Sequence, residues 1–185
     1  MTTFIDSYLN HRRFFNVSAY VSRNLCKFAG GKIILMMNES FVIQSNIAQL
    51  PYVEERVFHF CRECNVGNYY SAVSVAVLQA VENAIVHGNG SDESKAVTIS
   101  MGTCHGGVFV EVSDEGAGFD YTHVGSLDDA AKGQGIFVMR SLSDRMSFSN
   151  SGRQVRMEFD VAGIDPADAL ERASVLQAHF SLVAA

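Results

Sequence analysis

Residues 73–88 read VSVAVLQAVENAIVHG, and this stretch decides the fold of the chain. Between residues 69 and 87 the apolar side chains fall within one stripe at about 100° per residue, which predicts the most apolar helix of the sequence. A helix of that composition must lie in the core. Three short polar and glycine-rich islands follow in order, at residues 83–88, 114–119 and 132–136, and they are the candidates for chemistry.

The first island ends the core helix with Asn-Ala-Ile-Val-His-Gly at residues 83–88. Asn83 either forms a hydrogen bond to a neighbouring helix or to water, or places its carboxamide oxygen on Mg²⁺, a hard cation that also accepts water and phosphate oxygens. His87 lies about one turn later on the same helix face. It either reaches a phosphate group or simply ends the helix before Gly88.

The second island, Asp-Glu-Gly-Ala-Gly-Phe at residues 114–119, directly follows a predicted buried strand. Asp114 either belongs to an ordinary turn or accepts a hydrogen bond from the exocyclic amine of a base. In the second case Gly116 and Gly118 would let the backbone approach a flat ring without side-chain collision. The island is therefore a candidate base-binding loop.

The third island contains Lys132, Gly133, Gln134 and Gly135 and stands immediately before an apolar helix. Free backbone N–H groups at a helix start, with a lysine beside them, make an anion site. Gly-x-Gly alone is too short to be specific, and this island is neither a Walker A loop nor a Rossmann fingerprint. Each island alone is weak evidence for a binding site, and the three in this order are stronger evidence together.

The surrounding sequence alternates helices with hairpins. Residues 50–63 predict a helix with Arg56 among its outward-facing residues, and residues 134–144 predict another. Strict alternation around residues 102–107 predicts one hairpin, and strands near 146–161 predict a second. This pattern favours an α/β (α+β) two-layer sandwich, in which a mixed, mostly antiparallel sheet packs against helices.

The two ends of the chain are predicted as helical additions to this core. Helical spacing near residues 3–29 predicts one or two helices, and residues 32–44 could form a hairpin around a turn at 38–40. Asp165 and Pro166 begin a predicted C-terminal helix. The expected organisation is an N-terminal helical extension (1–31), a central domain (32–162) and a C-terminal helix (163–185).

Composition limits the class of protein. The 185 residues are 48% hydrophobic, enough for one sizeable core, and a net charge of -6 with a pI near 5.4 argues against nucleic-acid binding. We find neither a leader-like N-terminus nor a run of roughly 20 apolar residues, so a cytoplasmic protein without a membrane segment is expected. Cys61 and Cys64 could form a zinc or redox site, but free thiols in a reducing compartment are the favoured interpretation.

The three islands resemble the N, G1 and G2 boxes of the GHKL ATPases, which share the Bergerat fold. Their wording is most similar to that of the bacterial anti-sigma-factor serine/threonine kinases, over roughly residues 41–161. The resemblance implies ATP and Mg²⁺ as cofactors. Such kinases bind a sigma factor and phosphorylate a serine or threonine on an anti-sigma antagonist, and these partners are implied here, with a homodimer possible.

The resemblance also implies roles for individual residues. Asn83 would bind Mg²⁺, and Asp114 would hold the adenine amine beside the pocket-shaping Gly116 and Gly118. The loop at residues 132–135 would cradle phosphates beneath a lid formed by residues 121–131.

Two positions depart from the family pattern. Gln79 stands where the family usually has a glutamate acting as general base, and a carboxamide can orient a nucleophile but cannot take its proton. Glu82 could substitute, or could simply be solvated or ion-paired. Arg153 stands where the family tends to have a threonine, so that pocket contact is in question, although an arginine could meet a phosphate.

Three functions therefore remain open from the sequence. The first is an active anti-sigma-type kinase, and the second is a nucleotide-binding partner-switch module that has lost phosphotransfer. The third, a histidine kinase catalytic domain, is disfavoured because no long dimerisation hairpin is evident, and His11 is a poor candidate phosphoacceptor.

Overall fold

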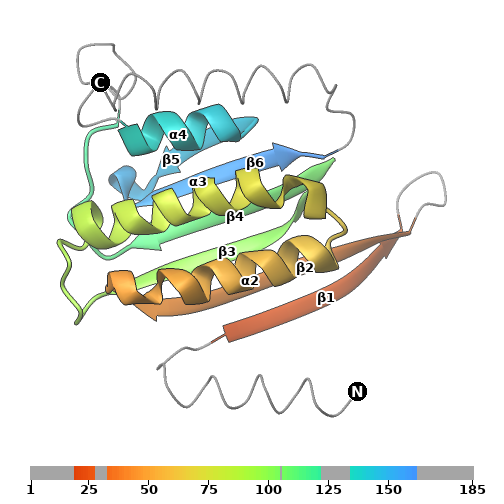
Figure 1. Cartoon of the computed structure of the whole chain (residues 1–185), viewed down its shortest axis with the longest axis horizontal. Coiled ribbons are helices and arrows are strands. Elements are labelled where there is room, and N and C mark those ends of the chain that lie inside the picture. Colours follow the sequence, from red (N-terminus) through yellow and green to blue (C-terminus); the bar gives the residue numbers. More distant parts are fainter. Residues whose placement is uncertain (1–18, 28–32, 105, 122–133, 162–185) are drawn as a thin grey trace.

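The computed structural model describes residues 19–27, 33–104, 106–121 and 134–161. In this part of the chain one antiparallel sheet carries a layer of helices on one face (Figure 1). The strands are β1 (Ala19–Lys27), β2 (Ile33–Gln44), β3 (Ala96–Cys104), β4 (Gly107–Asp114), β5 (Arg145–Ser149) and β6 (Gln154–Asp160). The helices are α2 (Leu50–Glu63), α3 (Tyr70–Asn83) and α4 (Gln134–Leu142), with a π-helix at Ala84–Gly88 and 3₁₀ turns at Ile47–Gln49, Gly67–Tyr69 and Asn150–Gly152.

The six strands pair in the order β1-β2-β3-β4-β6-β5, and every pair is antiparallel. The predicted α+β sandwich is confirmed, with a sheet that is antiparallel throughout its described strands. Strand β6 lies between β4 and β5, so the chain leaves the sheet after Asp114 and returns through α4 to the outer strand β5. That excursion places α4 beside α3, over the same end of the sheet as the second island.

Helix α3 lies in the middle of the helical layer, flanked by α2 and α4 (Figure 1). Its inward stripe is buried, as the sequence predicted, and so are the inward positions of the central strands. Burial of apolar surface on this scale is the main stabilising term of the fold. The core residues contributed by α3 and its neighbours β3 and β4 are Val73, Ala76, Val77, Ala80, Val81, Val97, Ile99, Met101, Val108, Val110 and Val112.

The predicted N-terminal helix is wrong at Ala19–Lys27, which forms strand β1 and pairs with β2 along its whole length. Pairing with a long neighbouring strand overrides helical spacing in the sequence, because the sheet supplies hydrogen bonds that local periodicity does not reveal. Residues 1–18 and the predicted C-terminal helix from Asp165 lie outside the described residues. The division at residues 31 and 162 stays a prediction.

The predicted hairpin at residues 32–44 is also wrong, because β2 runs without a turn from Ile33 to Gln44. Glu39, read as part of a turn, points into the core and is 4% exposed. Arg56, predicted to face outward from α2, is 7% exposed and forms an ion pair with Glu39. The buried charge is tolerated because its partner comes from the helix that covers the strand.

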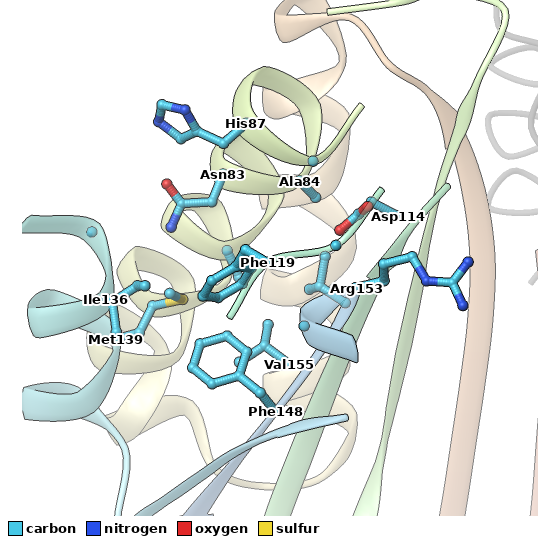
Figure 2. A pocket seen from close by; sticks show the side chains of 16 residues that line it. Asn83, Ala84, His87, Asp114, Phe119, Ile136, Met139, Phe148, Arg153 and Val155 are labelled. Carbon is cyan, nitrogen blue, oxygen red and sulfur yellow. The ribbon is translucent and has the colours of Figure 1, made fainter. Parts of the chain in front are cut away.

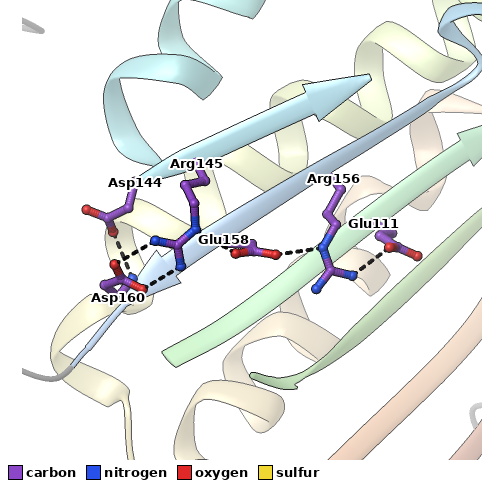
Figure 3. A network of polar contacts seen from close by, with 6 residues as sticks. All are labelled: Glu111, Asp144, Arg145, Arg156, Glu158 and Asp160. Atoms are coloured by element: carbon purple, nitrogen blue, oxygen red, sulfur yellow. Dashed lines mark hydrogen bonds and ion pairs between the residues drawn. The ribbon is translucent and has the colours of Figure 1, made fainter. Parts of the chain in front are cut away.

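The other face of the sheet carries polar side chains from alternate positions of β4, β5 and β6 (Figure 3). Arg145 bonds Glu158 and Asp160, and Arg156 bonds Glu158 and Glu111, all at 2.6–3.0 Å. The two guanidinium groups lower the pKa of Glu158 through these hydrogen bonds. The network joins the outer strand β5 to the centre of the sheet.

One helical segment of the described residues, Gly67–Gly88, is long and apolar enough by length and composition to cross a membrane, with 22 residues and a mean hydropathy of 1.2. This segment contains α3, whose apolar stripe belongs to the core described above.

The cysteines at Cys61, Cys64 and Cys104 are free, as expected. Burial raises the pKa of Cys61 to about 12, and burial together with the charges of Cys61 and Glu63 raises the pKa of Cys64 to about 12. Both groups are therefore protonated thiols at neutral pH, the inert form of cysteine.

Candidate functional site

A pocket of about 210 Å³ opens between α3, α4 and the ends of β4, β5 and β6 (Figure 2). Parts of all three islands meet in its wall, although they are separated by up to about 50 residues in the sequence. The middle of the pocket is apolar, and polar groups stand toward its ends. The lining residues are Ala80, Asn83, Ala84, His87, Gly88, Val112, Asp114, Gly118, Phe119, Gly135, Ile136, Met139, Phe148, Gly152, Arg153 and Val155.

The first island does not continue α3 as a regular α-helix. Residues Ala84–Gly88 form a π-helix, in which the Asn89 N–H donates to the Ala84 carbonyl at 2.8 Å. Single π turns inside helices occur frequently at functional sites, because the extra residue per turn changes which side chains face a partner. Here the turn brings Ala84 and Gly88 into the pocket wall beside Asp114.

We call the end of the pocket at the second island, the candidate base-binding loop, the base end. It is built around Asp114, the last residue of β4. Its main-chain N–H donates to the Arg153 carbonyl at 3.0 Å, and its Oδ1 accepts from the Gly116 N–H at 2.8 Å. Burial raises the pKa of the Asp114 carboxyl above its ordinary value of 3.8, opposed by the Gly116 hydrogen bond and the charge of Arg153. The half-buried carboxylate is an acceptor set into an apolar wall.

Close packing of main chain explains two of the predicted glycines at this end. A side chain on Gly116 would collide with the Gly88 carbonyl oxygen, and one on Gly118 would collide with the Ser151 carbonyl oxygen. Gly118 also has a φ of 79°, a conformation that glycine adopts without strain. The second island therefore packs its backbone tightly against the first island and against the β5–β6 connection.

An aromatic group lies across the pocket from α4. Phe119 and Phe148 are packed edge to face with ring centroids 5.3 Å apart, and Tyr121 lies 5.6 Å from Phe148. Phe119 and Phe148 both point into the pocket, opposite Ile136 and Met139 of α4 (Figure 2). These surfaces can enclose a flat apolar ring.

The opposite end of the pocket is polar and lies where α3 meets the first turn of α4. The carboxamide of Asn83 points toward α4 (Figure 2). Gln79 and Asn83 lie so close to Gly135 that a β-carbon there would stand 2.8 Å from Gln79 Nε2 and 2.9 Å from Asn83 Nδ2. The structure therefore brings Gln79 and Asn83 together beside the third island.

Glu82 and His87 are placed less centrally. Glu82 is exposed on α3, and its Oε2 accepts a hydrogen bond from Gln79 Nε2 at 3.4 Å. His87 is exposed, and its ring points away from Asp114 (Figure 2). Glu82 thus lies within reach of the Gln79 carboxamide but does not line the pocket.

The third island is described only from Gln134 onward. Gln134 is the first residue of α4, and Gly135 lines the pocket, so the first turn of this helix lies at the polar end. Lys132 and Gly133, with most of the predicted lid, lie outside the described residues.

Arg153 lines the pocket with its aliphatic stem, while its guanidinium points away (Figure 2). Its Nε donates to the Asn150 carbonyl at 3.1 Å. The stem of Arg153 packs beside the second island, because a β-carbon on Gly118 would stand 3.3 Å from Arg153 Cγ.

Sequence reasoning missed several residues that build the site. Phe148 and Met139 line it, and both were read only as apolar positions of a strand and a helix. Asn89, one residue beyond the first island, is buried, and its Oδ1 accepts a hydrogen bond from the Glu115 N–H of the second island. The sequence gives no signal for Asn89, because an asparagine between two glycines is typical of an exposed turn.

The chain contains an ATPase domain of the GHKL type, as its match to a known family shows. Residues 46–159 match the family described as "Histidine kinase-like ATPase domain". The chain belongs to this family.

Curated relatives carry a narrower description. The chain is 33% identical over 137 residues to "Anti-sigma F factor" of Clostridium perfringens (strain SM101 / Type A), an alignment covering 65% of this chain and 86% of the relative. It is 32% identical over 100 residues to "Anti-sigma F factor" of Clostridium botulinum (strain Eklund 17B / Type B), covering 48% and 68%. The resemblance to anti-sigma-factor proteins inferred from the islands is thereby confirmed.

Proposed function

We propose that this protein binds Mg-ATP in the pocket and acts as a cytoplasmic anti-sigma regulator, holding a sigma factor and phosphorylating a serine or threonine of an antagonist protein. One observation carries the proposal. The half-buried acceptor Asp114 and the carboxamide of Asn83 stand at opposite ends of one apolar pocket, in a chain of the ATPase family whose relatives are described as anti-sigma F factors.

The base end fits adenine. The Asp114 carboxylate, held by the Gly116 N–H, would accept a hydrogen bond from the exocyclic amine, and Gly118 lines the same end of the pocket. Phe119 and Met139 offer apolar surface to the two faces of the base. Burial raises the pKa of this carboxyl, and in its ionised form a carboxylate forms stronger hydrogen bonds than a neutral acceptor.

The polar end fits Mg²⁺ held together with phosphates. Asn83 supplies a hard carboxamide oxygen, and the described residues hold no group of three His, Cys, Asp or Glu side chains arranged to cage a metal. Mg²⁺ commonly takes one or two protein ligands and completes its shell with water and phosphate oxygens. The N-terminus of α4, with Lys132, Gly133, Gln134 and Gly135, would bind the phosphate oxygens.

Phosphotransfer depends on what replaces the usual base. In this chain Gln79 is placed beside Asn83 and Gly135, where it can orient an attacking hydroxyl but cannot accept its proton. Glu82, hydrogen-bonded to Gln79, is the nearest carboxylate described on the same helix and is the candidate acceptor.

The position of Gln79 favours a second function. A protein that binds Mg-ATP and a sigma factor without transferring phosphate would serve as a nucleotide-gated partner switch. Loss of a general base typically lowers rate by about 10²- to 10⁴-fold, which is enough to separate the two functions experimentally.

The test uses labelled ATP, the purified sigma factors of the source organism and its candidate antagonist domains. We expect Mg-ATP to raise the melting temperature of the native protein and Asn83→Ala to lose that shift, because a ligand that binds only the folded state stabilises it. We expect one sigma factor to co-elute with the native chain. Absence of both effects would refute the proposal.

Gln79→Glu then separates the two functions. Phosphate transfer by the native protein, reduced in Glu82→Gln, supports the kinase. Transfer only after Gln79→Glu, with sigma binding unchanged, supports the partner switch.

A further inference from the structure

We propose that Asn89 is a positioning residue for the base end of the pocket: it holds the loop at Asp114–Gly116 in the one place where the Asp114 carboxylate meets the exocyclic amine of a base. The inference rests on the nucleotide-binding function proposed above. Asn89 belongs to none of the three islands and does not line the pocket. It acts through Asp114.

The contacts of Asn89 join three segments of the chain. The residue is 3% exposed. Its Oδ1 accepts from the Glu115 N–H at 2.9 Å, and its Nδ2 donates to the Ala96 carbonyl at 2.9 Å. Its own N–H closes the π-helix on the Ala84 carbonyl. One side chain therefore fixes the end of β4 and the start of β3 to the end of the helix that carries Asn83.

The chemistry of these partners requires a carboxamide. One partner is a donor and the other an acceptor, and among side chains of this size only asparagine offers both a planar acceptor and a planar donor. Aspartate would face the Ala96 carbonyl with an unfavourable charge, and alanine would remove the hydrogen-bond partner of two part-buried main-chain groups. The orientation of the Asn89 amide follows from the partners themselves.

Hydrogen bonds hold the chain on both sides of the peptide between Asp114 and Glu115. Glu115, whose N–H bonds Asn89, also accepts from the Ala96 N–H through its Oε2 at 2.7 Å. On the other side Gly116 donates to Asp114 Oδ1. Asp114 is therefore positioned by the peptide that Asn89 holds, while Gly88, next to Asn89, forms the surface against which the carboxylate lies.

The experiment compares ATP with inosine triphosphate, which carries an oxygen in place of the exocyclic amine, by calorimetric titration in the presence of Mg²⁺. The proteins are the native chain, Asn89→Ala, Asn89→Ser, and Asp114→Asn as the benchmark for a lost amine contact. Asn46→Ala is the matched control, because it loses two side-chain hydrogen bonds in a loop that does not line the pocket.

We expect the native protein to prefer ATP by roughly 10- to 100-fold, the value of a hydrogen bond to a charged group. In Asn89→Ala the preference should fall toward that of Asp114→Asn, with Asn89→Ser intermediate and Asn46→Ala unchanged. If Asn89 only stabilised the fold, its variants would bind both nucleotides more weakly by the same factor, and that result overturns the inference.

Two further outcomes keep the inference and the proposed function distinguishable. Binding of neither nucleotide by the native chain refutes the proposed function and this inference with it, whereas a retained ATP preference in Asn89→Ala refutes the inference alone. If no Asn89 variant folds, hydrogen exchange of the Glu115 amide in the native protein decides. Strong protection supports the Asn89 contact, and exchange at the rate of an open loop overturns it.

Discussion

The carboxylate of Asp114 lies directly against Gly88: a β-carbon at residue 88 would stand 2.5 Å from Asp114 Cγ and within 2.8 Å of both carboxylate oxygens. The two residues lie 26 positions apart in sequence. Their contact joins the first and second islands without any side chain from Gly88. The Asp114 carboxylate can therefore occupy this position only because residue 88 has no side chain.

Gly88→Ala should weaken ATP binding by roughly tenfold or more, because the new methyl group must push the Asp114 carboxylate out of line. The effect is measured by titration calorimetry with Mg-ATP. Gly67→Ala is the control, since a β-carbon there has nothing within 4 Å. Equal affinities for the two variants would contradict the proposed role of the contact.

Asp114→Asn should separate stability from binding. Burial raises the folded-state pKa of Asp114, so the folded protein holds this proton more tightly than the unfolded chain. Ionisation therefore costs folding stability as pH rises from 3.8 toward the raised pKa, and the asparagine variant escapes that cost.

At neutral pH we expect Asp114→Asn to be at least as stable as the native protein to urea, and to have lost its preference for ATP over inosine triphosphate. The stability difference should shrink as the pH falls through the same window. A variant that is markedly less stable at neutral pH would show that the carboxylate supports the fold instead.

Gly135→Ala tests the polar end of the pocket. Alanine favours a helix over glycine by about 1 kcal/mol, and the neighbouring atoms are the movable ends of Gln79 and Asn83. We expect an unchanged or higher melting temperature but a smaller shift on adding Mg-ATP, because both carboxamides are displaced. Gly67→Ala again serves as the control, and a full nucleotide-dependent shift in Gly135→Ala would contradict the arrangement.

Arg56→Met should lower the free energy of unfolding by about 3–5 kcal/mol, because it leaves the Glu39 carboxylate buried without its partner. The double variant Glu39→Leu with Arg56→Met should recover most of that loss. Urea denaturation measures both, with Arg62→Met on the exposed side of the same helix as control. A double variant as unstable as Arg56→Met would show that the pair is not the cause.

The central helices and hairpins could be predicted from the sequence because their periodicity is local. Helix α2 spans Leu50–Glu63 as predicted, and β3 and β4 alternate as expected. The continuity of strand β2 could not be predicted, because the charged Glu39 near its centre is typical of a turn as long as its buried ion-pair partner is unknown. Arg56 lies 17 residues away, and only the tertiary fold brings it to Glu39.

The pocket likewise contains residues that could be predicted from the sequence and residues that could not. Its polar groups were predictable because each island carries its own signal, and Asn83, Asp114 and Gly135 do meet in one pocket. The apolar wall was not, because Phe148 and Met139 are ordinary core residues until α4 is placed over β5. Lys132 and Gly133 stay predictions.

The order β4-β6-β5 has a consequence for how a ligand would change the molecule. Between β4 and β5 the described residues 115–121 and 134–144 lie outside the sheet, and the pocket touches the first segment at Phe119 and the second at Gly135. A nucleotide bound between them would act as a reversible cross-link between the chain just beyond β4 and the first turn of α4. Hydrogen exchange of the α4 amides should therefore slow when ATP is added, and slow more than exchange in β1 and β2 at the far side of the sheet.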